Sequence, residues 1–230
     1  DPIHDANLNI ICTLNVIELC KKYSIKNLYS ASTFAVYGDP INPEKPIMED
    51  DLCSPKSLYG VSKLASEQYI RILCAKYDIR WNILRMFNVY GPGQDLTRLD
   101  QGVVSIFLNY IRSQNVLPVK GSLDRFRDLV YIDDVIQAWS KCIMQQNASN
   151  KVYNVASGKK HSFRKLIEEL IDIYGKKNEI KIHHEDETPG DILGCYANIS
   201  RISNDLNYLP KFSLRDGLTN FKDWANNQPQ

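Results

Sequence analysis

The sequence predicts an α/β protein whose mainly parallel sheet is joined by crossover helices. Stretches with apolar residues at helical spacing, most of ten or more residues, alternate with short apolar stretches typical of buried strands. Loops rich in polar residues or glycine follow several of these strands, and ligands bind at the carboxyl edge of a parallel sheet. The alternation therefore predicts strands joined by crossovers, with a ligand site at one edge of the sheet.

Composition and charge exclude several classes of partner. With 230 residues, 43% of them hydrophobic and 24% charged, the chain has room for one globular domain, or for one domain with a smaller lobe. A net charge of +1 gives no electrostatic attraction for nucleic acid or an anionic membrane, and no apolar run is long enough to span a bilayer. We expect neither as a partner.

Cysteine and histidine usage indicates a reduced protein without a metal. The six cysteines are scattered, with no Cys-x-x-Cys pair, as in the mostly buried thiols of a cytoplasmic protein. His183 and His184 are adjacent, but no further ligand follows at the spacing of a metal site. No metal site is therefore expected.

The first half of the chain predicts two helices and two strands. Residues 8–22 carry apolar residues at helical spacing, and residues 26–32 follow as a short strand. Four prolines mark a long loop before a helix at 58–77. An apolar strand at 81–87 then ends at the turn Gly91-Pro92-Gly93.

The second half continues the alternation and ends with two helices. Ser162 is the expected N-cap of the first of these, because its hydroxyl can accept from a free backbone N–H of the first turn. The predicted helices are 103–112, 135–144, 162–174 and 214–224, and the predicted strands are 116–119, 128–132, 152–155 and 180–183.

Tyr59 and Lys63 lie four residues apart at the start of the helix at 58–77. Positions i and i+4 share one face of a helix, so the ammonium can lower the pKa of the phenol and allow acid–base chemistry near neutral pH. The chain has 13 tyrosines, so such a pair also arises by chance. Its place between the strand-end loops 30–38 and 87–93 favours a catalytic role.

Four motifs in a fixed order carry a family resemblance across nearly the whole chain. They resemble those of the extended short-chain dehydrogenases/reductases, and within them the NAD-dependent nucleotide-sugar epimerases and dehydratases of the UDP-glucose 4-epimerase type. The helix at 8–22 also contains Asn9-Ile-Ile-Cys-Thr13, similar to the family's Asn-x-x-Gly-Thr with Cys12 in place of glycine. The four motifs are Ser30-Ala-Ser-Thr-Phe-Ala-Val-Tyr-Gly38, Tyr59-Gly-Val-Ser-Lys63, Arg85-Met-Phe-Asn-Val-Tyr-Gly-Pro-Gly93 and Arg127-Asp-Leu-Val-Tyr-Ile-Asp-Asp134.

The resemblance implies a Rossmann-type parallel sheet with a smaller α/β C-terminal lobe for the substrate. Residues 1–92 and 129–156 would form the remainder of the NAD-binding domain, and residues 93–128 and 157–230 the nucleotide-sugar lobe. None of the 11 glycines forms the family's glycine-rich dinucleotide turn. We therefore expect the N-terminal strands of the sheet to be missing from this chain, and the chain alone to hold NAD poorly. Without that segment the choice between NAD and NADP stays open.

Three residues would form the catalytic centre that the resemblance implies. Tyr59 would be the acid/base on a sugar hydroxyl, and Lys63 would hold the nicotinamide ribose and lower the pKa of Tyr59. Thr33 would bridge the sugar hydroxyl and Tyr59, with Ser32 as the alternative. Ordinary positions on a helix turn and a strand are the competing interpretation.

The remaining site residues would bind the cofactor or the nucleotide sugar. With Tyr59 and Lys63, the residues Ser32, Phe87 and Asn9 would contact NAD, although core packing and a helix surface explain the last two equally well. On the substrate side, Asn88 would bind the sugar diphosphate, unless it is only a turn asparagine. The other two substrate residues would be Arg127, whose planar donors suit the pyrophosphate, and Asp191, which would bind the uridine ribose.

Two departures from related patterns narrow the reaction and leave the substrate open. Phe34 and Ala35 stand where nucleotide-sugar dehydratases carry an Asp-Glu pair, and elimination of water needs that second acid and base. Epimerisation by oxidation at C4 and hydride return is therefore favoured over dehydration and decarboxylation. Thr188 stands where many 4-epimerases have an arginine, so the exact sugar and nucleotide stay open.

Two other functions remain compatible with the sequence. One is an NADP-dependent nucleotide-sugar reductase or epimerase-reductase, which would consume its cofactor. The other is a non-catalytic fragment or nucleotide-binding module, suggested by the absence of the glycine-rich turn.

A homodimer is the expected assembly. The resemblance implies a contact through two helices, one of which carries Tyr59. Its apolar seam would be formed by Leu14, Ile17, Ile70, Leu73 and Tyr77, which could equally be core residues.

Overall fold

A computed structural model of the chain describes residues 1–98, 102–145, 148–186 and 193–228. A parallel sheet of three strands lies at its centre, in the order β1 (Asn27–Thr33), β2 (Arg80–Met86) and β7 (Lys151–Val155). Asn27 pairs with Arg80 and Thr33 with Met86, so β1 and β2 end level with each other. The predicted α/β fold with a parallel sheet is confirmed.

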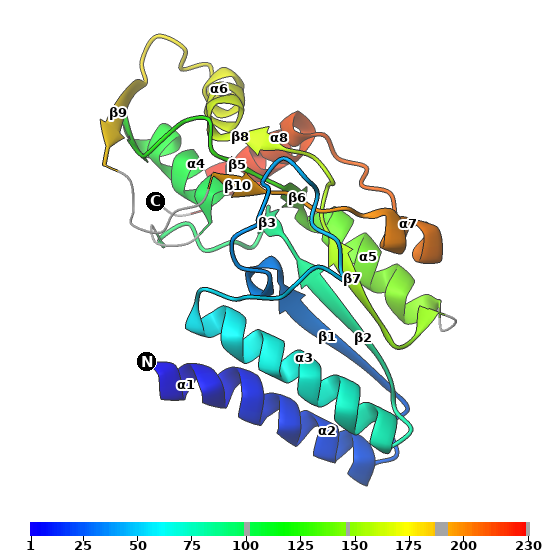
Figure 1. Cartoon of the computed structure of the whole chain (residues 1–230). Coiled ribbons are helices and arrows are strands. Elements are labelled where there is room, and N and C mark those ends of the chain that lie inside the picture. The colour runs from blue at the N-terminus through cyan, green and yellow to red at the C-terminus, as the bar shows by residue number, and fades with distance from the viewer. Residues whose placement is uncertain (99–101, 146–147, 187–192, 229–230) are drawn as a thin grey trace.

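The two faces of this sheet are covered by different helices (Figure 1). Ile83 and Val152 belong to one buried cluster together with residues of α2 (Cys12–Lys22) and α3 (Leu58–Lys76). The neighbouring strand residues Leu84 and Tyr153 belong to another, with residues of α5 (Ile132–Met144) and α7 (Ser200–Leu206). Successive strand residues point to opposite faces, which explains why each strand contributes to both clusters.

The N-terminal helix is longer than predicted and is interrupted. Asp1 accepts hydrogen bonds from the first backbone N–H groups, so α1 (Pro2–Ala6) begins six residues before the predicted start at Leu8. A π-helical turn at Asn7–Ile11 joins α1 to α2. The carbonyl of Asn9, inside this turn, accepts hydrogen bonds from the hydroxyls of Thr13 at 2.6 Å and Ser66 at 3.0 Å. The turn therefore links the N-terminal helix to α3.

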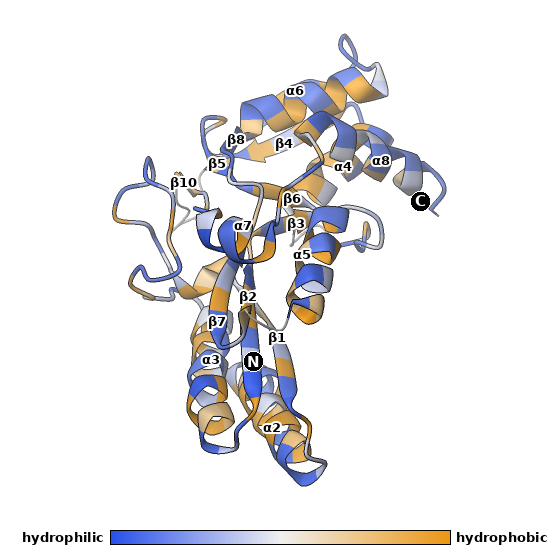
Figure 2. Ribbon diagram, turned by 90° about the vertical axis from the view of Figure 1, so that its right-hand side faces the viewer, coloured by the Kyte–Doolittle hydropathy of each residue, from blue (hydrophilic) through white to orange (hydrophobic). Residues whose placement is uncertain are grey.

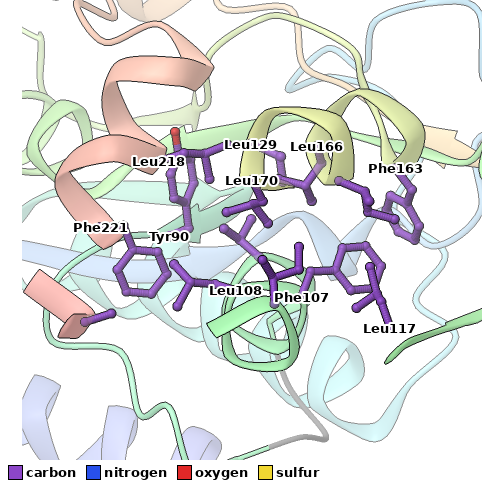
Figure 3. Packing of buried hydrophobic residues seen from close by; sticks show 14 of the residues in the cluster. Tyr90, Phe107, Leu108, Leu117, Leu129, Phe163, Leu166, Leu170, Leu218 and Phe221 are labelled. Carbon is purple, nitrogen blue, oxygen red and sulfur yellow. The ribbon is translucent and has the colours of Figure 1, made fainter. Parts of the chain in front are cut away.

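A second part of the molecule is built around three helices, α4 (Val103–Ser113), α6 (Phe163–Tyr174) and α8 (Leu214–Asn226). Figure 3 shows their buried side chains packed on one another, with Tyr90 of β3 (Asn88–Tyr90) at the edge. Ser162 caps α6, as predicted, by accepting from the backbone N–H of Lys165. Near this core, β4 (Val116–Lys120) pairs with β9 (Lys181–Glu185), and β5 (Phe126–Arg127) pairs with β8 (His161–Ser162) and β10 (Gly194–Cys195).

The predicted strand at 128–132 is two short strands in different sheets. Arg127 ends β5, whereas β6 (Leu129–Tyr131) pairs with β3, and Asp128 separates them. Helix α5 then starts directly at Ile132, three residues before the predicted start. The elements β8, β10 and α7 were not predicted, because each is too short to show an apolar period.

The predicted dimer seam is partly wrong. Ile17 and Ile70 are buried at 0% and 1% exposure in the core beneath α2 and α3, and Leu73 and Tyr77 pack against that cluster. The apolar residues that these helices expose are different. Figure 2 shows that α2 and α3 both carry hydrophobic segments, in orange. The exposed apolar residues include Ile3, Leu8, Ile11, Val16 and Leu19 on the N-terminal helix, and Leu58, Val61 and Ile72 on α3.

Two further observations complete the fold. All six cysteines are free thiols, and four of them are buried, as predicted. Among the described residues, no helix is both long and apolar enough to cross a membrane.

Candidate active site

The site is built where the carboxyl end of β1 meets the first turn of α3. Thr33 is the last residue of β1, and Ser57 caps α3 by accepting from the backbone N–H of Gly60. A Cβ on Gly60 would lie 2.6 Å from the carbonyl oxygen of Ala35. The absence of a side chain at Gly60 therefore lets the start of α3 lie directly against the turn that follows Thr33.

Tyr59 and Thr33 are brought together by this close approach. The side chain of Thr33 lies close enough to the Tyr59 phenol to lower its pKa, and the Thr33 oxygen accepts from the backbone N–H of Ala35 at 3.2 Å. Burial raises the pKa of Tyr59, and the charge of Asp5 raises it further, whereas Thr33 lowers it. The predicted depression of this pKa by Lys63 is not observed: burial has the largest influence, and Lys63 is not among the groups that shift this pKa.

Lys63 lies one turn after Tyr59 on the same face of α3 and is half-buried. Burial lowers the pKa of its ammonium group, whereas Glu67, Asp5 and Cys12 raise it. Within the described ranges, the ammonium group has no hydrogen bond and no carboxylate within 4.0 Å. A half-buried donor without a partner fits the hydroxyl groups of a ribose, so the Tyr59–Lys63 face has the donor set that an NAD ribose needs.

The other three predicted cofactor residues already have partners within the protein. Ser32 donates to Glu67 Oε1 at 2.5 Å, and Asn9 Nδ2 donates to Asp5 at 3.2 Å. Phe87 is 4% exposed and stacks on Phe34 with the ring centroids 5.4 Å apart. Their contacts with a cofactor therefore stay a prediction.

Two of the predicted substrate residues lie near each other at the junction of β5, β6 and β3. The backbone N–H and Nδ2 of Asn88 donate to the carbonyl of Asp128, at 3.1 and 3.3 Å. Arg127, the adjacent residue, donates from Nη1 to the Phe126 carbonyl at 2.8 Å, and burial lowers the pKa of its guanidinium. The third substrate residue, Asp191, lies outside the described residues.

Asp128 is a structural centre of the site that was not predicted. Its carboxylate is completely buried and accepts from the N–H and hydroxyl of Ser157 at 2.8 and 2.6 Å. It also accepts from the N–H groups of Gly158 at 3.0 Å and Ala197 at 3.1 Å. This side chain therefore joins the end of β7 to the segment after β10. A charged residue inside the apolar run Phe126–Tyr131 was the signal that could have indicated it.

A surface cavity of about 510 Å³ lies in the proline-marked loop and not at the Tyr59–Lys63 face. Its lining comes from residues 37–56 and includes the exposed Ile41 and the buried Ile47. None of the predicted site residues lines it, so it carries no argument about the reaction.

The fold and the Tyr59–Lys63 face define a nucleotide-cofactor enzyme with a parallel α/β sheet. The chain belongs to the NAD dependent epimerase/dehydratase family, whose model matches residues 1–156. The family resemblance seen in the sequence is therefore confirmed.

Several curated relatives of the chain are named as nucleotide-sugar epimerases. A putative UDP-glucose 4-epimerase of Methanocaldococcus jannaschii is 32% identical over 99% of this chain and 72% of its own length. The chain spans 64% to 72% of the lengths of the first three curated relatives.

Two solved structures are similar over nearly the whole chain. A UDP-glucose 4-epimerase of Thermotoga maritima, solved with UDP-glucose, has a TM-score of 0.90 and 29% identity, over 98% of this chain and 72% of that one. A UDP-glucose 4-epimerase of Thermus thermophilus, in complex with NAD, has a TM-score of 0.87 and 28% identity, over 99% and 72%.

Proposed function

We propose that the protein is an NAD-dependent epimerase of a nucleotide sugar, of the UDP-glucose 4-epimerase type. The observation that carries the proposal is the approach of Thr33, at the end of β1, to the Tyr59 phenol, with Lys63 one turn further along the same helix face. The similar structures in complex with UDP-glucose and with NAD support the same ligands for this chain.

The chain's own residues would move the proton. Tyr59 would remove the proton from the C4 hydroxyl of the sugar, and Thr33 would orient that hydroxyl toward the phenol oxygen. Lys63 would hold the cofactor ribose and stabilise the phenolate. NAD, when bound, supplies the acceptor for the hydride of C4 and the donor for its return to the other face. Phe34 and Ala35 offer no carboxylate for eliminating water, which favours epimerisation.

The nucleotide part of the substrate would bind on the side of β5 and β6. Arg127 would pair with the diphosphate, Asn88 would donate to it, and Asp191 would bind the ribose. In this proposal residues 93–128 and 157–230 form the substrate lobe, and residues 1–92 and 129–156 belong to the NAD-binding domain.

A homodimer through α2 and α3 belongs to the same proposal. The exposed apolar residues Leu8, Leu19, Val61 and Ile72 lie on adjacent helices, and they offer a self-complementary surface to a second copy.

The test is turnover of UDP-galactose and UDP-N-acetylglucosamine by the native protein with NAD. Tyr59→Phe keeps the ring and removes the acid/base, so its kcat is expected to fall by about 10²–10⁴-fold. Tyr23→Phe removes a phenol that is 63% exposed at the end of α2, and should turn over like the wild type. Unchanged activity in Tyr59→Phe would contradict the role of Tyr59 as the acid/base.

Two other results would redirect the assignment. Stoichiometric oxidation of NADPH with a keto-sugar would identify a reductase. Titration calorimetry that detects neither NAD nor UDP binding to the native protein would identify a module without this catalytic role.

A further inference from the structure

A buried carboxylate that the proposed chemistry does not use lies one turn after Lys63. Glu67, on α3, is 1% exposed, and both of its carboxylate oxygens have partners. Oε1 accepts from the hydroxyl of Ser32 at 2.5 Å and from Nε of Arg85 at 3.0 Å, and Oε2 accepts from Nη2 of Arg85 at 2.6 Å. A charge removed from water to this extent persists only when it is paired and hydrogen-bonded.

Arg85, the arginine of this pair, also contacts protein groups other than Glu67. Arg85 is 1% exposed on β2, and its Nη1 donates to the carbonyl of Glu49 at 3.1 Å. Its guanidinium lies 4.7 Å from the ring centroid of Tyr37, whose hydroxyl donates to Asn154 Oδ1 at 2.7 Å. The position of Glu67 is therefore determined by β1, β2 and the loop after β1 together.

Glu67 is connected to two parts of the proposed catalytic centre, the end of β1 and the Lys63 face of α3. Ser32 directly precedes Thr33, so the bond from Ser32 to Glu67 ties the end of β1 to α3. Lys63 and Glu67 are i and i+4 on one helix, so the carboxylate lies on the face that carries the ammonium group.

Other charged or titratable groups surround the two residues. Burial lowers the pKa of Lys63, whereas Glu67, Asp5 of α1 and Cys12 of α2 raise it. Burial is the main cause of a raised pKa at Cys53, in the loop after β1. Glu67 raises this pKa further, and Arg71 of α3 lowers it. Of the groups that favour the charged form of Lys63, Glu67 has the largest influence, and burial opposes it.

We propose that Glu67 is a positioning residue of the Tyr59–Lys63 centre. Its buried carboxylate holds the Thr33 end of β1 against α3, and it places a negative charge on the face of α3 that carries Lys63. The inference rests on the proposed function for its catalytic meaning. Its structural content, a buried negative charge on the Lys63 face of α3, can be tested without turnover.

The charge is tested with the variant Glu67→Gln combined with Arg85→Gln, which leaves no unpaired buried charge. NMR of protein labelled with ¹³Cε-lysine follows each ammonium group with pH, and the spectrum of Lys63→Met identifies the Lys63 signal. Lys63 is expected to lose its proton at a lower pH in the double variant than in the wild type, because the carboxylate that favours its charged form is gone. The alkaline limb of the kcat profile should move in the same direction. Glu18→Gln, a charge change on the neighbouring helix, is the control and should leave both unchanged.

The hydrogen bond from Ser32 to Glu67, the tether between β1 and α3, is tested separately. Ser32→Ala removes it and keeps every charge. We expect kcat to fall roughly tenfold, the cost of one lost hydrogen bond, with KM for the nucleotide sugar and the Lys63 titration unchanged. Rescue of kcat in Ser32→Thr, which restores a hydroxyl, would support the tether.

The outcomes separate this inference from the proposed function. A Lys63 signal that titrates alike in the wild type and the double variant overturns the role of the charge, and an unchanged kcat in Ser32→Ala overturns the tether. If the wild type has no epimerase activity, the proposed function fails, and the NMR titration still decides the role of the Glu67 charge. Should the double variant fail to fold by circular dichroism, Ser32→Ala and Glu67→Gln alone are measured in the same way.

Discussion

At the scale of single residues, the chemistry depends on one hydroxyl–hydroxyl contact. Tyr59 is 47% exposed, whereas Thr33 is 8% exposed at the end of a strand. The fixed, buried hydroxyl therefore orients the more accessible one. A pKa of Tyr59 that burial raises also implies that the phenol of the unliganded protein is protonated near neutral pH.

Thr33→Val removes this hydroxyl and keeps the shape of the side chain. Because Tyr59 loses its hydrogen-bond partner, we expect kcat for the nucleotide sugar to fall roughly tenfold, with a smaller change in KM. Thr33→Ser, which keeps the hydroxyl, is the matched control and should retain most of kcat. Equal values in the two variants would contradict the role of the contact.

His161 predicts a pH dependence of stability. Burial, with Lys159 adding to it, lowers the pKa of His161 to about 4, and its Nδ1 is buried without a partner in the part of the chain that the structure describes. The unfolded chain, with a histidine pKa near 6.5, takes up the proton first. Stability is therefore lost as pH falls from about 6.5 toward 4, by about 2 kcal/mol between pH 7 and pH 5.

Urea unfolding at pH 7 and pH 5 measures this loss. His161→Gln should lose less stability than the wild type over the same interval, whereas His4→Gln, at an exposed position on α1, should behave like the wild type. The same pH dependence in His161→Gln and the wild type would contradict the assignment.

The order of the motifs in the sequence predicted the candidate catalytic residues, but it did not predict the hydrogen-bond partners of the site residues. The spacing of the motifs indicated Tyr59, Lys63 and Thr33, because strand-end loops of a parallel sheet meet at one edge. The partner of Ser32 could not be predicted, because Glu67 is 35 residues away and a glutamate in a helix is normally solvated. The side-chain bond from Asn9 to Asp5 likewise depends on the local helix geometry.

At the scale of elements, the site depends on how closely α3 approaches the turn after β1. The alternation of long helices with short strands predicted α3, α4 and all three strands of the main sheet to within two residues. It could not predict the π-helical turn at Asn7–Ile11, which leaves the apolar period almost unchanged. Nor could it divide the apolar run at 126–131, because β5 and β6 differ only in the sheet that each joins.

Gly60→Ala tests the close approach. A Cβ at this position would lie 2.6 Å from the Ala35 carbonyl oxygen and 2.9 Å from Cβ of Pro55, so either α3 or the turn must shift. We expect a loss of about 2 kcal/mol in the free energy of unfolding, measured in urea, and a lower kcat because Tyr59 moves away from Thr33. Gln68→Ala, at an exposed position on the same helix, should change neither.

At the scale of the whole molecule, the outer surface of the two N-terminal helices exposes a group of apolar residues that the catalytic site does not explain. Ile72 and Val61 are 65% and 50% exposed on α3, and Leu8 and Leu19 are 61% and 51% exposed beside them. Isolated exposed apolar residues need no explanation, but a group of them on two packed helices is typical of an interface.

Ile72→Glu combined with Val61→Glu should convert a dimer into a monomer, because each copy would place carboxylates in the centre of the contact. Sedimentation velocity across a range of protein concentrations measures the change. Ile41→Glu, at a position that is 100% exposed in the proline-marked loop, is the control and should keep the assembly of the wild type. A wild type that is monomeric at all concentrations would contradict the proposed interface.

The chain passes repeatedly between the main sheet and the α4–α6–α8 core: it leaves after β3, returns at β6, leaves after β7, returns at α7 and leaves again to α8. Asp128 joins two of these passages through its bonds to Ser157 and Ala197. Several chain segments connect the main sheet to the helical core, and the buried Asp128 carboxylate links two of them. Such a connection is more rigid than a single flexible linker. A large opening and closing of the two parts around a ligand is therefore disfavoured, and entry and exit of a ligand would depend on movements of loops and side chains at the rim.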